Sequence, residues 1–303
     1  MSEVPYLDAA ALQRLVPLTA AVDAIESLFA GDGVEVPQRS HLHVGGGDLV
    51  VMPAWGPEGV GVKLVTVNPA NPAAGRPLIH GVYVLFDRGS LAPVLIVDGA
   101  ALTALRTPAV SAVATKHLAA PGARRLVIFG AGTQARGHLE AMRTVRDVFE
   151  VVVVTRDPAH AAAVVDAARE AGLGARSGSP EDVRDADLVC TCTTSTTPLF
   201  DGTLLAPGTH VNAVGAYKPD ARELDDATIA RAAVVVEDRA AALAEAGDLL
   251  QPLAAGVLDA DEILGLHDVL QGRRPDGEVT VFKSVGLASE DLAVAAAALA
   301  ALG

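Results

Sequence analysis

The stretch that decides the fold is Leu126-Val-Ile-Phe-Gly-Ala-Gly-Thr-Gln-Ala135, an apolar run followed by a Gly-x-Gly-x-x-Ala turn. The apolar run predicts a buried strand, and the pattern over residues 136–145 predicts a helix after the turn. Gly130 lets the chain turn tightly, Gly132 lets the backbone approach a pyrophosphate, and Ala135 lets helix and strand pack closely. Phosphates would then bind the N–H groups at the start of the helix. The stretch therefore predicts a dinucleotide-binding turn.

The second predicted strand, residues 150–155, decides which dinucleotide is favoured. Sites selective for NAD place an acidic side chain at the end of this strand, where it binds the ribose 2′-hydroxyl. Thr155 stands there instead, and it is followed by Arg156, whose guanidinium suits a 2′-phosphate and stacks on adenine. Asp157 comes one residue late, and it either reaches the ribose or begins the next helix beside Pro158. The sequence therefore favours NADP(H) as the cofactor and leaves NAD(H) open.

Strands and helices alternate after residue 124, and this rhythm predicts a doubly wound parallel sheet. The expected strands are 126–129, 150–155, 187–191, 209–214 and 234–237, with a helix over 158–171. The earlier part of the chain is mixed, and Pro121-Gly122 marks a boundary after it. Its expected elements are helices over 19–28 and 98–118 and strands near 48–52, 59–66, 80–87 and 91–98. We therefore predict an α/β protein with a mixed α+β domain, residues 1–118 with 284–303, and a Rossmann-type domain, residues 119–283.

The composition limits the kinds of partner. The 303 residues carry a formal net charge of −14, so the surface repels nucleic acid and anionic membranes. The N-terminus has no signal-peptide pattern, and the apolar stretch 292–302 is too short to cross a bilayer. Cys190 and Cys192 do not have the spacing of a zinc or thioredoxin motif, so we expect buried free thiols and no metal site. A cytoplasmic protein that acts on small molecules, without nucleic-acid or membrane partners, is the expectation.

Several separate motifs accompany the glycine-rich turn. They are Val62-Lys63-Leu64, Leu85-Phe86-Asp87, Asp98-Gly99 with residues 102–107 and 109–112, Asn212-Ala213-Val214-Gly215 with Glu223-Leu224-Asp225, and Lys283-Ser284-Val285-Gly286. With these motifs the chain resembles the ornithine cyclodeaminase and mu-crystallin family over nearly its whole length. The resemblance implies a nicotinamide cofactor and a small imino- or amino-acid substrate. It also implies that the first domain binds substrate and forms a homodimer, which would cover its strand edges.

The resemblance assigns the substrate side to four residues. Arg39 and Lys63 would bind the substrate carboxylate or face its reacting nitrogen, and Ser284 and Val285 would close the pocket. From the sequence alone, Lys63 inside the apolar run 60–65 has two interpretations. It is buried, with a lowered pKa suited to proton transfer, or it points to solvent from a half-exposed strand.

The cofactor side is implied in the same way. Arg106 would contact the phosphates, His80 matches a cofactor-contacting histidine in mu-crystallin, and Thr193 and Val214 would lie on the loops beside the nicotinamide. The full set of expected cofactor-binding residues is His80, Arg106, Gly130, Ala131, Gly132, Thr133, Gln134, Thr155, Arg156, Asp157, Thr193 and Val214.

One departure separates the chain from the cyclodeaminases. In those enzymes, and in related alanine dehydrogenases, an aspartate thought to be the general acid/base lies between Val-Gly and Glu-Leu. Here Tyr217 stands at that position and Asp220 is three residues away. A tyrosine donates a hydrogen bond but is a poor base near neutral pH. The segment 219–225 looks instead like mu-crystallin, whose side of the family reduces ketimines.

The sequence thus predicts an NADP(H)-preferring oxidoreductase that reduces the C=N bond of a ketimine bearing a carboxylate, such as pyrroline-2-carboxylate or piperideine-2-carboxylate. Lys63 and Tyr217 are the expected catalytic residues. Three alternatives stay open: an ornithine cyclodeaminase-type lyase, an amino-acid dehydrogenase, and a non-catalytic, crystallin-like protein that binds NADPH.

Overall fold

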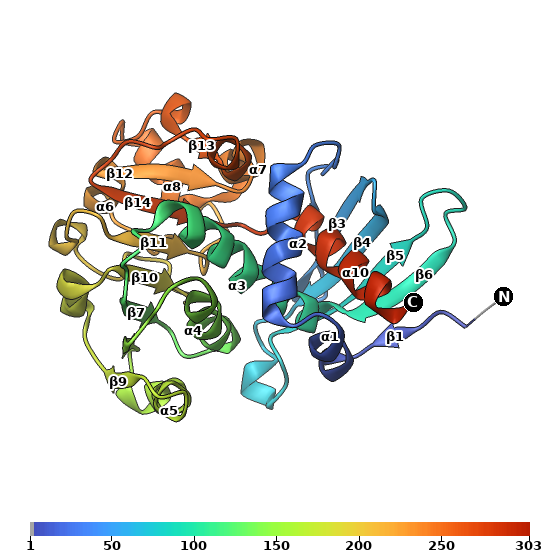
Figure 1. Cartoon of the computed structure of the whole chain (residues 1–303), viewed down its shortest axis with the longest axis horizontal. Helices are drawn as coiled ribbons and strands as arrows, with labels where there is room; N and C mark the ends of the chain where they lie inside the picture. The colour runs from blue at the N-terminus through green and yellow to red at the C-terminus, as the bar shows by residue number, and fades with distance from the viewer. Residues whose placement is uncertain (1–2) are drawn as a thin grey trace. The chain divides into compact units, whose positions relative to one another are not determined.

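The computed structural model describes residues 3–303, and the chain divides into two compact units (Figure 1). The first unit runs to Val110 and resumes at Gly286, and the second unit is Ser111–Val285. The predicted fold class, a doubly wound parallel sheet plus a mixed α+β part, is confirmed.

The first unit is built on a six-stranded sheet. Its strands are β1 (Tyr6–Leu7), β2 (Ser40–Val44), β3 (Gly47–Gly56), β4 (Gly59–Val67), β5 (Ile79–Phe86) and β6 (Pro93–Asp98). Their order is β1-β6-β5-β4-β3-β2, antiparallel except for the β1–β6 pair. Along β4, Gly61, Lys63 and Val65 are buried while the residues between them are half-buried. One face of the sheet is therefore covered more completely than the other.

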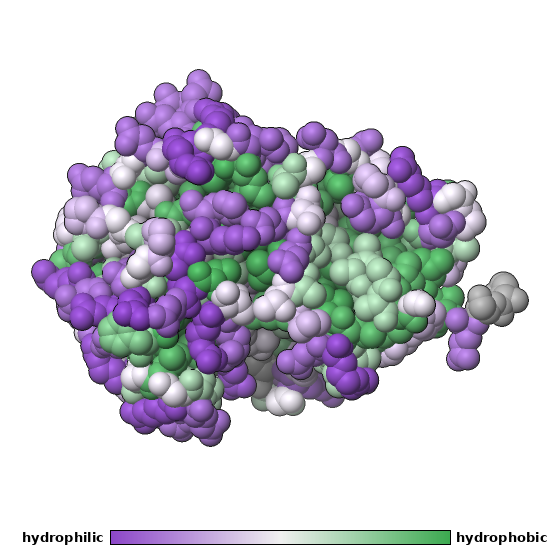
Figure 2. Space-filling model, in the orientation of Figure 1, coloured by the Kyte–Doolittle hydropathy of each residue, from purple (hydrophilic) through white to green (hydrophobic). Residues whose placement is uncertain are grey.

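Helices cover the buried face of this sheet. The unit contains α1 (Ala9–Leu15), α2 (Leu18–Ala30), the short 3-10 turn η1 (Pro72–Ala74), the first half of α3 (Gly99–Leu118) and α10 (Ala288–Leu302). Helix α10 packs on α2 and on β3, β4 and β5 (Figure 1). Its alanine-rich surface forms a pale green area in Figure 2, whereas its first turn buries Glu290 and Asp291 completely. The helix thus places two carboxylates against the sheet.

The second unit is built on an eight-stranded parallel sheet. Its strands are β7 (Arg125–Phe129), β8 (Glu150–Val154), β9 (Gly174–Ser177), β10 (Leu188–Thr191), β11 (His210–Ala213), β12 (Ala232–Val236), β13 (Leu264–Gly265) and β14 (Val279–Lys283). Their order is β13-β12-β14-β11-β10-β7-β8-β9, so the chain winds one way from β7 to β9 and the other way from β10. Strands β7, β8 and β10 are buried over consecutive residues, so both faces are covered. The switch point where such folds bind dinucleotides lies between β7 and β10.

The helices of this unit are short. They are the second half of α3, α4 (Thr133–Val145), α5 (Ala162–Glu170), α6 (Asp226–Ala230), α7 (Arg239–Glu245), α8 (Gly247–Ala254) and α9 (Leu266–Leu270), with 3-10 turns η2 (Pro158–Ala161), η3 (Pro180–Asp185), η4 (Gly202–Leu204) and η5 (Ala260–Glu262). The helix predicted over 158–171 begins as a 3-10 turn, because Asp157 caps it and Pro158 stands at its first position. Within residues 3–303, no helix combines the length and apolar character that a membrane span requires.

Candidate active site

The Gly-x-Gly-x-x-Ala turn follows the carboxyl end of β7, beside the switch point. Gly130 has a φ of 104°, and a Cβ there would lie 2.5 Å from the carbonyl oxygen of Cys192. Both observations require glycine. A Cβ on Gly132 would meet no described atom within 4 Å. The turn is thus packed against the sheet at Gly130 and open at Gly132, while Ala135 is fully buried.

The start of α4 fits a phosphate group. Gly132 is the N-cap, and among residues 3–303 no side chain caps the helix there. The first N–H groups of a helix have no intrahelical acceptor and carry a partial positive charge. Gly132 and Thr133 are exposed, and Ala131 and Gln134 are half-buried. This geometry suits the pyrophosphate of a dinucleotide.

Three predicted cofactor-binding residues, Thr155, Arg156 and Asp157, follow the end of β8. The Thr155 hydroxyl donates to the carbonyl of Asp157 (2.8 Å), and the Asp157 carboxylate accepts the N–H of Ala159 (3.0 Å). Asp157 therefore begins the next helical turn beside Pro158, one of its two predicted roles. Arg156 is exposed at this end of the strand.

Thr193 and Val214 lie on the loops that follow two neighbouring strands, β10 and β11, at the same edge of the sheet as the turn. Thr193 donates from its N–H (2.8 Å) and its hydroxyl (2.7 Å) to Glu223. The N–H of Val214 donates to the carbonyl of Thr191 (3.1 Å). Both predicted residues are thus held in well-defined backbone.

In the first unit, Lys63 on β4 is 1% exposed. Its Nζ lies 2.7 Å from Asp291 Oδ2 and donates to Asp291 Oδ1 (2.9 Å) and to the Thr103 hydroxyl (3.2 Å). Burial lowers the pKa of Lys63 from 10.5 to about 8, although the charge of Asp291 opposes this shift. The interpretation in which Lys63 points to solvent is wrong, because its strand position faces α10.

Arg106 on α3 continues this cluster. It is 5% exposed, and its Nη1 pairs with Glu290 Oε2 at 2.9 Å. Its Nε lies 3.5 Å from Asp291 Oδ1. A Cβ on Gly286, whose φ is 78°, would lie 2.4 Å from Arg106 Nη1, and half-buried Arg39 donates to the Gly286 carbonyl (3.4 Å).

The sequence analysis missed the two carboxylates of this cluster. Glu290 and Asp291 are adjacent acids in the first turn of an otherwise apolar, alanine-rich helix, which is the signal that was available. With them, the cluster has three cationic side chains, Arg39, Lys63 and Arg106, and two carboxylates. Among these five groups, one positive charge is in excess, and this suits an anionic ligand.

Several known proteins resemble this chain over most of its length. A model of the ornithine cyclodeaminase/mu-crystallin family matches residues 8–299. The chain belongs to this family. A Δ1-pyrroline-2-carboxylate reductase from Bacillus cereus is 42% identical over 262 residues, covering 81% of this chain and 79% of the relative. The ketimine reductase mu-crystallin of Mus musculus is 37% identical, covering 93% and 90% of the two chains.

A solved structure of a family member superposes closely. It is the Δ1-pyrroline-2-carboxylate reductase of Thermococcus litoralis in complex with NADH and L-proline. The TM-score is 0.92 at 32% identity, covering 98% of this chain and 96% of that chain.

The position that separates this chain from the cyclodeaminases of the family is half-buried. Tyr217 packs against the apolar core of the second unit, and Lys218 Nζ lies 6.0 Å from the centre of its ring. Asp220, the nearby carboxylate, is exposed.

The predicted substrate-side residues Ser284 and Val285 are both bound by one carboxylate. Ser284 Oγ donates to Glu237 Oε1 (2.5 Å) and the N–H of Val285 donates to Glu237 Oε2 (3.0 Å). Glu237 follows β12 directly and is buried, so it fixes the start of the returning segment. His80, predicted on the cofactor side, is exposed on β5.

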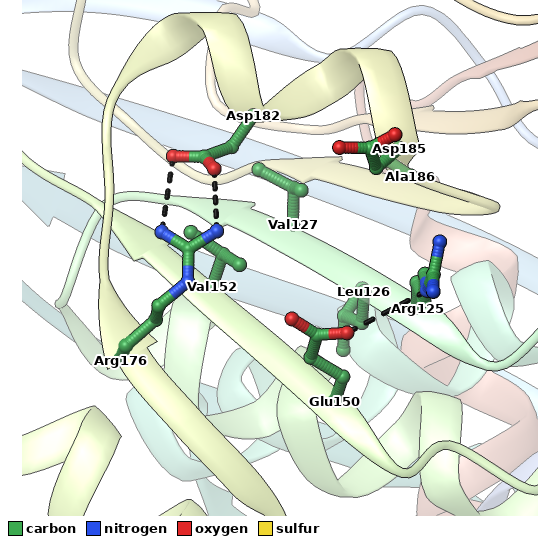
Figure 3. Close-up of a pocket in the computed structure, with 9 residues that line it drawn as sticks. All are labelled: Arg125, Leu126, Val127, Glu150, Val152, Arg176, Asp182, Asp185 and Ala186. Carbon is green, nitrogen blue, oxygen red and sulfur yellow. Dashed lines mark hydrogen bonds and ion pairs between the residues drawn. The ribbon is translucent and has the colours of Figure 1, made fainter.

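A hollow of about 290 Å³ lies at the opposite, amino-terminal edge of the parallel strands (Figure 3). Its arginines are engaged in ion pairs, Arg176 with Asp182 and Arg125 with Glu150. The charges in the hollow are largely compensated, so we assign it no ligand. Both cysteines are free thiols, and Cys192 is half-buried rather than buried as predicted.

Proposed function

We propose that this protein is an NAD(P)H-dependent reductase of the C=N bond in imino acids that bear a carboxylate. Cyclic ketimines such as Δ1-pyrroline-2-carboxylate and piperideine-2-carboxylate are the substrate class. The observation that carries the proposal is the cluster of buried Lys63 and Arg106 with half-buried Arg39, in which the five charged groups carry one positive charge in excess. The Thermococcus litoralis relative binds proline, which is the product of reducing pyrroline-2-carboxylate.

When bound, the nicotinamide coenzyme supplies the hydride that adds to the imine carbon. Arg39 and Lys63 bind the substrate carboxylate, and this contact fixes the orientation of the C=N bond. Lys63 also carries a proton for the nitrogen as that atom becomes an amine. Asp291 holds Nζ of Lys63 in place and favours its protonated form.

The roles predicted for Tyr217, Ser284, Val285 and His80 stay predictions. So does a contact between Arg106 and the cofactor phosphates, since Arg106 is engaged by Glu290 in this structure. A cytoplasmic location also stays a prediction.

The proposal includes a preference for NADP(H) over NAD(H). Its support is the exposed guanidinium of Arg156 at the end of β8 and the use of the Asp157 carboxylate as a cap. Arg156→Ala should raise the KM for NADPH by about 10-fold and leave the KM for NADH unchanged, because only NADPH carries the 2′-phosphate. Equal changes for both coenzymes would contradict the preference.

The proposal also includes a homodimer through the first unit. The sheet face opposite α10 exposes apolar side chains in part, and such a face suits a second copy of the chain. These residues are Val51, Trp55, Val60, Val62, Leu64, Val82, Val84 and Ile96. Light scattering should give the mass of a dimer, and Leu64→Lys should reduce it to that of a monomer.

The test of the activity is the oxidation of NADPH and of NADH in the presence of each cyclic ketimine. Ketimine-dependent oxidation supports the proposal. Ornithine with NAD is assayed in parallel for proline. Proline formed from ornithine without net cofactor reduction would establish the cyclodeaminase instead, and tight NADPH binding without any turnover would establish the non-catalytic alternative.

A further inference from the structure

A buried carboxylate that the proposed chemistry does not use joins the two loops after β10 and β11. Glu223 is fully buried and accepts five hydrogen bonds. The donors are the Thr191 hydroxyl (2.9 Å), the N–H and hydroxyl of Thr193, and the N–H groups of Gly215 (2.8 Å) and Ala216 (3.1 Å). One side chain thus binds both loops at once.

A second buried side chain, Lys283, binds backbone carbonyls of the loop after β11. Lys283 Nζ donates to the carbonyls of Ala213 and Ala216 and lies 2.9 Å from Asp248 Oδ2. Asp248 Oδ1 in turn accepts the backbone N–H of Glu223 (2.7 Å). The backbone of residues 213–216 is therefore fixed through its N–H groups by Glu223 and through its carbonyls by Lys283.

The two loops also touch directly at Gly215. A Cβ on this residue would lie 2.2 Å from the carbonyl oxygen of Thr193 and 2.5 Å from Glu223 Oε1. No larger side chain fits there without moving the backbone. The contact leaves little freedom for either loop as long as Glu223 is present.

The position of these loops relates them to one half of the cofactor. In a doubly wound sheet the dinucleotide lies across the carboxyl edge, with its adenosine ribose at the end of the second strand, here β8. The nicotinamide half then lies on the other side of the switch point, over β10 and β11. Of the buried carboxylates in the second unit, Glu223 is the one that binds both of these loops.

We propose that Glu223 is a positioning residue that holds the loops after β10 and β11 in the shape that receives the nicotinamide half of the coenzyme. The inference rests on the nicotinamide coenzyme of the proposed function. It requires no particular substrate. A purely structural role would affect all ligands of the second unit alike, whereas positioning of these two loops affects only ligands that carry a nicotinamide.

The test compares NADH with ADP-ribose, which keeps the adenosine and pyrophosphate but lacks the nicotinamide, by titration calorimetry. In Glu223→Gln the side-chain amide places an NH2 group where a carboxylate oxygen accepted, so at least one backbone N–H of the two loops loses its acceptor and the negative charge that strengthened the other hydrogen bonds is removed. We expect NADH to bind about 10-fold more weakly or worse, and ADP-ribose to bind within about twofold of the wild-type affinity. If the wild type prefers NADPH, the pair is NADPH and the 2′-phosphate of ADP-ribose.

A second variant serves if Glu223→Gln does not fold. Thr191→Val removes one donor to Glu223 from a buried strand end and keeps the shape of the side chain. It should weaken NADH binding by about threefold, again without an effect on ADP-ribose. Glu150→Gln, a half-buried carboxylate at the amino end of β8, is the matched control and should change neither affinity.

Equal weakening of NADH and ADP-ribose in both Glu223→Gln and Thr191→Val would overturn the inference, and so would unchanged NADH affinity in Glu223→Gln. The binding experiment contains no imino acid. Absence of ketimine reduction would therefore remove the proposed function and leave this result intact.

Discussion

The molecule buries two lysines, one in each unit, and their partners differ. Lys283 in the second unit has three acceptors for its ammonium group, the Asp248 carboxylate and two backbone carbonyls. Lys63 in the first unit also lies near three oxygens, Asp291 Oδ1, Asp291 Oδ2 and the Thr103 hydroxyl. An ammonium group has three N–H donors. Both lysines therefore have three oxygens near their three donors, but two of those near Lys283 are backbone carbonyls, whereas all of those near Lys63 belong to side chains.

This difference shows that burial alone does not reveal what a lysine does. Both side chains are at most 1% exposed, and both pair with an aspartate. What separates them is the kind of acceptor that the protein supplies. Lys283 fixes the backbone of residues 213–216 through two carbonyls, whereas Lys63 is held by side chains alone.

The largest expected effect distinguishes the two lysines by activity. Lys63→Met should lower kcat/KM for the ketimine by about 100-fold or more, because the carboxylate contact and the proton carrier are both lost. Its affinity for NADH should stay near that of the wild type. Lys283→Met should mainly lower stability, by about 3 kcal/mol, because Asp248 is left buried without its cation.

Steady-state kinetics, NADH titration and urea unfolding of both variants check this pair of outcomes. Lys63→Arg is the matched control, because it keeps the charge. Equal losses of kcat/KM in Lys63→Met and Lys283→Met, at equal folded fractions, would remove the distinction between the lysines.

The next effect concerns the carboxylate beside Lys63. Asp291→Asn keeps the shape but leaves the Lys63 ammonium buried without an anion, and we expect a loss of about 3 kcal/mol in the free energy of unfolding. The double variant Lys63→Met/Asp291→Asn should cost less than the sum of the two single variants, because neither charge is then stranded. Urea unfolding of the four proteins measures this coupling, and additive losses would show that the pair contributes nothing as a pair.

The elements that the sequence predicted well are those with a local signal. The glycine-rich turn needs only residues 126–135, and its strand and helix follow from adjacent patterns. The strands without a prediction are β1, β2, β9, β13 and β14. The first four lie at the edges of their sheets, whereas β14 lies between β12 and β11. Edge strands are short and exposed, so they carry neither an apolar run nor a clear alternation.

In the candidate site too, the residues were predictable from the sequence but their partners, which are distant in sequence, were not. Lys63 was assigned by the family resemblance, since its place in an apolar run left its exposure open, and its partner Asp291 is 228 residues away in sequence. Lys63 is buried because α10 packs on its side of the sheet. No local sequence pattern predicts where α10 packs. Glu223 was visible only as part of a motif, because its five donors come from two other loops.

A pH dependence follows from the lowered pKa of Lys63. Burial lowers this pKa to about 8, Arg106 lowers it as well, and Asp291 and Glu290 raise it. Below about pH 8 the side chain is charged and binds the substrate carboxylate, so kcat/KM should fall by about 10-fold per pH unit above that value. Between about pH 8 and 10.5 the folded state binds fewer protons than the unfolded state, so the contribution of Lys63 to stability rises with pH.

The pH profile of kcat/KM for wild type and Lys63→Arg checks this assignment. The guanidinium stays protonated across the range, so the fall should move to higher pH or disappear in Lys63→Arg. A fall at the same pH in both proteins would assign it to the substrate or to another group.

The smallest expected effect tests whether burial is what makes the Lys63–Asp291 pair important. Arg125 and Glu150 also form an ion pair, at 3.5 Å, but their side chains are 50% and 36% exposed. Glu150→Gln should cost less than about 1 kcal/mol of unfolding free energy, since water solvates the remaining guanidinium. In Asp291→Asn, by contrast, the remaining ammonium lies where water does not reach it. Equal losses of unfolding free energy in Asp291→Asn and Glu150→Gln would mean that packing of uncharged atoms stabilises the buried cluster. The charges of the cluster would then serve ligand binding alone.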